Sequence, residues 1–119
     1  MYVILVLKKY IRKGMKRMEC SKKDWNLFKS KIAGWQENYM EKLNKEYIEI
    51  LSGNESASDK FWKLEERIKK DRKRKGVIIN MQKSDMVFDL IALLQDGAIE
   101  MADLEEFSEE VREMVKRFM

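Results

Sequence analysis

The sequence predicts an all-α protein, a small four-helix bundle made of a long N-terminal helical hairpin and a shorter C-terminal one. Three observations predict it. Apolar residues recur every three or four positions along most of the chain, proline is absent, and glycine-containing breaks separate the periodic segments. The length of 119 residues suits one small domain. Because 45% of the residues are apolar and 39% are charged, each helix must be apolar on a narrow face.

The longest periodic segment, 21–51, predicts the first helix. Ser21 followed by Asp24 is typical of a helix start, because a serine hydroxyl can accept a hydrogen bond from a backbone N–H in the first turn. Gly34 interrupts the segment, and its missing side chain would permit close contact with a neighbouring helix. The apolar stripe of this helix consists of Trp25, Phe28, Ile32, Trp35, Tyr39, Leu43, Tyr47 and Leu51.

A second helix, 56–73, completes the long hairpin after a break at 52–55. Ser56 and Asp59 repeat the helix-start signature. The apolar face of this helix consists of Phe61, Leu64 and Ile68. Residues 69–75 include no apolar side chain, so we expect this end of the helix to be solvated or bound to something acidic.

The last part of the chain predicts the short hairpin, with helices at 85–95 and 102–118. The first of these is apolar over most of its surface and is expected to be the central core element. The second carries apolar residues at helical spacing up to Phe118. The connection between them is short, which predicts antiparallel neighbours. Residues 21–119 therefore constitute a single helical domain in this interpretation.

Residues 1–20 are interpreted as a basic N-terminal extension. The apolar run 1–7 is too short to span a membrane, which takes about 20 residues, and its charges follow it rather than precede it as in a signal peptide. A membrane-surface anchor is one explanation of this segment. The other is a mis-assigned start, with translation beginning at Met15 or Met18, because the codons of 12–14 would resemble a bacterial ribosome-binding site. We expect a cytoplasmic protein without an integral membrane segment, from a bacterial source.

The composition argues against an enzyme and against a metal or cofactor site. The chain has no histidine, which removes the commonest general base and most zinc sites. Its single cysteine, Cys20, excludes an intramolecular disulfide. The five glycines are scattered and form no phosphate-binding loop. We therefore expect no catalytic residue, no metal ligand and no cofactor.

Positive charge is concentrated in residues 60–75, here called the basic segment, which hold nine cations and three anions. Clustered cations favour phosphate binding, because neutralised phosphates release counterions. The alternative is a solvated helix end whose cations complement the negative end of the helix dipole. The candidate polyanion-binding residues are Lys69, Lys70, Arg72, Lys73, Arg74 and Lys75.

Negative charge is concentrated in residues 96–113, here called the acidic segment, which contain eight acids and one base. These acids would repel phosphate, which argues against DNA recognition by the C-terminal hairpin. They form either a solvated face or a docking surface. Trp62, beside the cations, is the best candidate for an interface hot spot if it is exposed. The candidate docking residues are Trp62, Glu105, Glu106, Glu109, Glu110 and Glu113.

The favoured functional hypothesis is a non-enzymatic helical protein that docks another protein through its polarised charged faces. Opposite charges on one chain also favour self-association, including a dimer. The alternative hypothesis is a nucleic-acid-associated accessory factor that contacts phosphates through the basic segment and does not read sequence.

Overall fold

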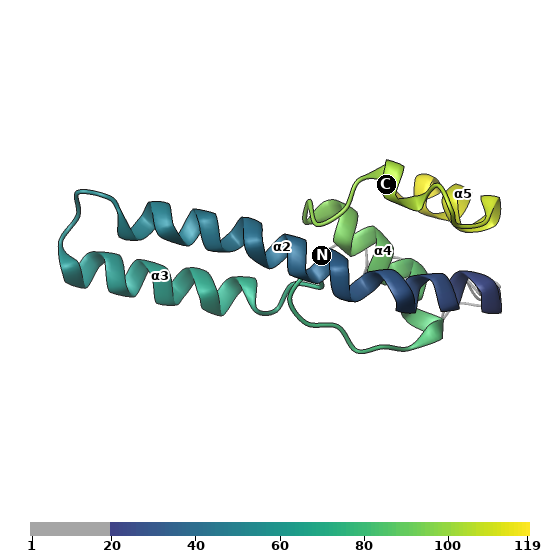
Figure 1. Cartoon of the computed structure of the whole chain (residues 1–119), viewed down its shortest axis with the longest axis horizontal. Helices are drawn as coiled ribbons and strands as arrows, with labels where there is room; N and C mark the ends of the chain where they lie inside the picture. The colour runs from purple at the N-terminus through teal and green to yellow at the C-terminus, as the bar shows by residue number, and fades with distance from the viewer. Residues whose placement is uncertain (1–19) are drawn as a thin grey trace.

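The computed structural model describes residues 20–119, which form four α-helices and two short 3-10 helices (Figure 1). The α-helices are α2 (Lys22–Leu51), α3 (Ala57–Asp71), α4 (Met86–Gln95) and α5 (Glu109–Arg117), and the 3-10 helices are η1 (Lys83–Asp85) and η2 (Met101–Leu104). No strand occurs in this part of the chain, so the all-α prediction is confirmed. The predicted N-terminal extension lies outside the described residues, apart from its last residue, Cys20.

The long helix α2 carries the other elements along its length (Figure 1). Helix α3 returns antiparallel beside the C-terminal half of α2, and α4 and α5 pack around the N-terminal half. The long and short hairpins therefore occupy opposite ends of an elongated molecule. None of the described helices is long and apolar enough to cross a membrane.

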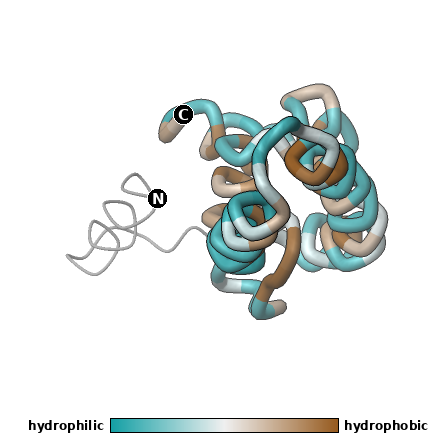
Figure 2. Tube along the Cα trace, turned by 90° about the vertical axis from the view of Figure 1, so that its left-hand side faces the viewer, coloured by the Kyte–Doolittle hydropathy of each residue, from teal (hydrophilic) through white to brown (hydrophobic). Residues whose placement is uncertain are grey.

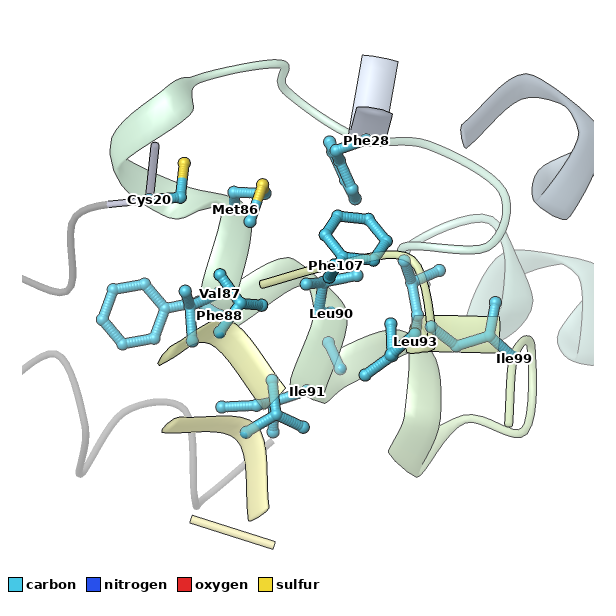
Figure 3. Close-up of a cluster of buried hydrophobic side chains, with 14 of the residues drawn as sticks. Cys20, Phe28, Met86, Val87, Phe88, Leu90, Ile91, Leu93, Ile99 and Phe107 are labelled. Atoms are coloured by element: carbon cyan, nitrogen blue, oxygen red, sulfur yellow. The ribbon is translucent and has the colours of Figure 1, made fainter. Parts of the chain in front are cut away.

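The hydrophobic core lies where α4 meets α2 and α5, and Figure 3 shows its labelled side chains converging there. Helix α4 is buried over eight consecutive residues, 86–93, which confirms its expected central position. Phe28 of α2 and Val115 of α5 close the core from two sides. Along the helices of Figure 2, hydrophobic and hydrophilic residues alternate, as expected of helices with one apolar face.

The predicted helix 102–118 is wrong in extent, because the chain breaks it at Ser108. Residues Met101–Leu104 form η2, and α5 begins only at Glu109. The Ser108 hydroxyl accepts from the Val111 N–H at 3.3 Å and caps α5. The same hydroxyl and the Ser108 backbone N–H donate to the carboxylate of Asp24, at 2.7 and 2.8 Å. This contact turns the chain and joins the start of α5 to the start of α2.

Asp24 is a buried carboxylate, 3% exposed, that binds the N-cap serines of two helices, Ser21 before α2 and Ser108 before α5. It accepts a hydrogen bond from the Ser21 hydroxyl at 2.9 Å. Burial raises the pKa of Asp24, but the hydrogen bonds from Ser108 and Ser21 outweigh it and hold the pKa below its ordinary value. Its contribution to stability is therefore present above the ordinary carboxyl pKa and is lost as the pH falls through the lowered value.

Two glycines differ sharply in their surroundings. A methyl group on Gly76 would overlap the buried ring of Tyr39, so the chain can pass this close to α2 only with a glycine there. At Gly34 nothing lies within 4 Å of the corresponding position. The expectation that Gly34 permits a close helix contact is therefore wrong, because this residue points to the exposed side of α2.

These surroundings predict opposite effects for the same substitution. Gly76→Ala should lower the free energy of unfolding by about 1–3 kcal/mol, because the buried Tyr39 ring must move. Gly34→Ala should raise the free energy of unfolding by about 0.5–1 kcal/mol, because alanine favours a helix interior without a new contact. Urea denaturation followed by circular dichroism measures both variants. Equal effects of the two substitutions would contradict this description of the α3–α4 connection.

Candidate functional site

The connection between the hairpins is organised by a buried carboxylate at the end of α3. Asp71 is 1% exposed. Its Oδ2 accepts from the Tyr47 hydroxyl at 2.7 Å and from Arg67 Nε at 2.9 Å. Its Oδ1 accepts from Arg74 Nε at 3.2 Å. Two guanidinium groups and a phenol thus compensate one buried negative charge, which is the condition for burying a carboxylate at acceptable cost.

Both arginines extend this network to further elements. Arg67 also binds Glu46 of α2 and lies over the Tyr47 ring, with 5.8 Å from the guanidinium carbon to the ring centroid. Arg74 Nη1 donates to Asp96 Oδ1 at 2.7 Å, at the C-terminal end of α4. The Asp71 network therefore links α2, α3 and α4.

Lys75 makes a second link beside the first. Its ammonium nitrogen lies 3.4 Å from Oδ1 of Asp89, a buried residue of α4. Its backbone carbonyl accepts from Gln36 Nε2 of α2 at 3.0 Å. Residues 74 and 75 thus hold the chain after α3 against both α2 and α4.

These contacts divide the candidate polyanion-binding residues into two groups. Arg74 and Lys75 are engaged inside the molecule. The other four, Lys69, Lys70, Arg72 and Lys73, are exposed, and no ion pair among the described residues involves them. The structure therefore does not bring all six together as one surface.

A shallow, open apolar surface, here called the α3 groove, runs along one face of α3 beside the exposed cations. The α3 groove has a volume of about 510 Å³ and is lined by Phe61, Leu64, Glu65, Ile68, Lys69 and Arg72. Phe61 is 61% exposed and Ile68 is 42% exposed. The apolar face recognised in the sequence is therefore present, but it does not belong to the core.

Trp62 stands next to the groove and is 63% exposed. Its ring packs edge-on against Phe61, with centroids 5.0 Å apart and an angle of 86° between the ring planes. Leu51, the last member of the α2 stripe, is also exposed at this end of the hairpin. The short C-terminal hairpin covers only the other end of α2, so a row of large apolar side chains stays in contact with solvent (Figure 1).

The acidic docking candidates lie on the C-terminal hairpin, away from Trp62. Glu106 pairs with Lys31 of α2 at 3.2 Å, and Glu105 is exposed beside it. The other three candidates, Glu109, Glu110 and Glu113, are exposed on α5, and this trio is here called the α5 acidic face. With Met114 and Arg117 they line a shallow hollow of about 370 Å³. The docking candidates therefore form two separate surfaces, one at α3 and one at α5.

Among residues 20–119, no group of three or more His, Cys, Asp or Glu side chains is placed so that it could hold a metal ion. The Cys20 thiol is buried and donates to the backbone carbonyl of Lys83 at 3.9 Å. No protein-family model, no curated protein and no solved structure matches the chain. The candidate site consequently rests on geometry and charge.

The Asp71 network brings together residues that the sequence pattern does not single out, among them Tyr47 and Asp71 itself. The available signal was local: Asp71 is the only acid in the run 69–75, and it stands four residues after Arg67. Periodicity places Tyr47 in the apolar stripe of its helix, but its hydroxyl donates a hydrogen bond to the buried carboxylate of Asp71. Asp89 and Asp96 gave no signal, because their partners follow α3 in the chain.

The network predicts a pH-dependent effect of Tyr47→Phe. Burial and the hydrogen bond to Asp71 raise the pKa of Tyr47 from 10.0 to about 12. Because the raised pKa belongs to the folded state, the stabilisation is complete below the unfolded value and is lost as the pH rises through the folded value. At neutral pH the variant should lose about 1 kcal/mol of unfolding free energy, the net value of one hydrogen bond.

Urea denaturation of both proteins from neutral to strongly alkaline pH measures this difference. The gap between wild type and variant should stay constant up to a pH near 10 and close by about 12. A gap that is absent at neutral pH, or one that does not change with pH, would contradict the assigned hydrogen bond.

Proposed function

We propose that the protein is a non-enzymatic docking module that binds another protein through the α3 groove and the adjoining Trp62. The observation that carries this proposal is the exposure of two packed aromatic side chains, Phe61 and Trp62, which are 61% and 63% accessible to solvent. Aromatic side chains bury the largest areas in interfaces and dominate binding hot spots. A cytoplasmic location and a bacterial source are parts of the same proposal, supported by the sequence pattern alone.

The chemistry of the groove selects the kind of partner. Its apolar centre, around Phe61 and Leu64, suits the apolar face of an amphipathic helix, which is a common way for a groove to bind a protein. Lys69 and Arg72 line the same groove and favour acidic residues on that helix. We therefore propose an amphipathic, acidic helix as the binding partner's docking element.

The long hairpin gives this surface a rigid support. The face of α3 that meets α2 carries Arg67 and Asp71, and their ion pairs with neighbouring elements hold α3 in one orientation. A surface that is ordered before binding loses less entropy when a partner docks. A polar hollow of about 250 Å³ lies beside Tyr39 and Lys42 and is lined by members of the Asp71 network. We assign it no role in binding.

Site-specific cross-linking tests the proposal in the full-length protein. A photoactivatable phenylalanine analogue is placed at Glu65 in the groove and, as a matched control, at the exposed Lys45 of α2. In a nuclease-treated lysate of the source cells, we expect a discrete protein adduct from position 65 and none from position 45. Trp62→Ala should reduce the yield of that adduct at least about tenfold, as expected of a hot-spot residue. Equal adducts from both positions, or an adduct insensitive to Trp62→Ala, would overturn the proposal.

Nucleic-acid binding is the second candidate function, and one observation favours it. Lys69, Lys70, Arg72 and Lys73 are exposed without an ion pair among the described residues, so they could neutralise phosphates. Four phosphate contacts would give a slope of log affinity against log salt of about −3 to −4. Arg74 and Lys75 are left out of this set, since reversing their charges would disrupt the network.

Fluorescence anisotropy with a labelled DNA duplex and a labelled single-stranded RNA measures this function. Binding should fall with salt at that slope and disappear when the four exposed cations are changed to Glu, whereas Trp62→Ala should leave it unchanged. Binding that survives the four-site variant, or no binding at low salt, would eliminate the second candidate.

A further inference from the structure

The α3 groove and the α5 acidic face carry opposite charges but do not meet within one molecule. The helices that carry them, α3 and α5, lie on different hairpins and beside different halves of α2 (Figure 1). Among the described residues, the acidic segment forms two ion pairs, Lys31 with Glu106 and Arg74 with Asp96. Lys75 of the basic segment pairs with Asp89, which lies outside the acidic segment. Intramolecular pairing therefore does not account for the complementarity of the two surfaces.

The exposed side of helix α5 is acidic in its first turn, while Lys116 and Arg117 follow in its last turn and its Val111 and Val115 belong to the core. Glu109, Glu110 and Glu113 are exposed on the helix, and Met114 lies beside them half-buried. Met119, just after the helix, is exposed. The helix therefore offers acidic groups together with flexible apolar side chains, which adapt well to an interface.

The two elements also agree in length. Nine residues of α5 span about 13 Å at 1.5 Å per residue. The lining of the groove extends from Phe61 to Arg72, which corresponds to about 16 Å along α3. One α5 helix can therefore lie along most of the groove.

We propose that α5 of a second copy of this chain occupies the α3 groove, in a head-to-tail arrangement. The inference rests on the groove named in the proposed function and adds the identity of its occupant. Lys69, Arg72 and Lys73 face the α5 acidic face across this interface, around an apolar centre of Phe61 and Met114. Because the two contact surfaces differ, copies joined head to tail either close into a ring or extend as an open chain. The assembled mass therefore rises with concentration, and salt weakens the assembly.

Two charge-reversal variants of the full-length protein test this arrangement. The groove variant carries Lys69→Glu, Arg72→Glu and Lys73→Glu, and the α5 variant carries Glu109→Lys, Glu110→Lys and Glu113→Lys. Circular dichroism verifies that each is folded. If Lys near the start of α5 destabilises that helix, Glu→Gln at the same positions provides a milder second variant.

Sedimentation velocity at low salt measures the assembly. Wild type should form oligomers whose mass rises with concentration. Each variant alone should be mainly monomeric, with an apparent affinity for self-association at least about tenfold lower than that of wild type. An equimolar mixture of the two variants should assemble again, because the reversed charges are then complementary in both directions. This rescue is the result that the inference predicts.

Three results would overturn the inference. A wild-type protein that stays monomeric at the highest attainable concentration excludes self-docking, while the cross-linking test of the proposed function stands independently. An α5 variant that assembles as well as wild type shows that α3 pairs with another α3. Two variants that are monomeric alone and also in the mixture show that charge complementarity does not join the two surfaces.

Discussion

The buried ionised carboxylate of Asp71 is the interaction on which the arrangement of the molecule depends. A carboxylate out of contact with water costs several kcal/mol unless charged partners and hydrogen bonds compensate it. Its partners come from α2, from α3 and from the connection that follows, as Tyr47, Arg67 and Arg74. Since Arg74 also reaches Asp96, the same set of contacts fixes α4 and its core against the long hairpin. The C-terminal half of the long hairpin is therefore joined to α4 by polar contacts, while the apolar core joins the N-terminal half of α2 to α4 and α5.

This constraint determines which surfaces remain for binding. Arg67 and Asp71 occupy the face of α3 that contacts α2. The apolar residues Phe61 and Ile68 lie outside this interface and are exposed on another face of the helix. The network also engages Arg74, which leaves the cations before it available to a partner.

The features predicted correctly from the sequence depend on neighbours in the chain. Ser21 and Ser56 accept hydrogen bonds from the N–H groups of Asp24 and Asp59, as their spacing indicates. Residues 86–93, apolar except for Asp89, lie at the centre of the core because this helix is apolar over most of its surface. The break at Ser108 could not be predicted, because it depends on Asp24, 84 positions earlier.

The site was predicted only in part, for the same reason. Periodicity shows that α3 has an apolar face, but it does not show whether another element covers that face. Trp62, which lies off the apolar line of its helix, is exposed as that position indicates, and its docking role stays a prediction. The grouping of Trp62 with the glutamates was wrong, because charge along the sequence says nothing about the distance between hairpins.

Amide hydrogen exchange in wild type and in Asp71→Asn tests the central claim most directly. The substitution keeps the size of the side chain and removes the charge that the arginines and Tyr47 compensate. The account predicts that amides of α3 lose at least about tenfold in protection, while those of α4 keep theirs, because the core around α4 does not need the network to remain folded. Unchanged protection in α3, or an equal loss in α3 and α4, would contradict the role assigned to Asp71.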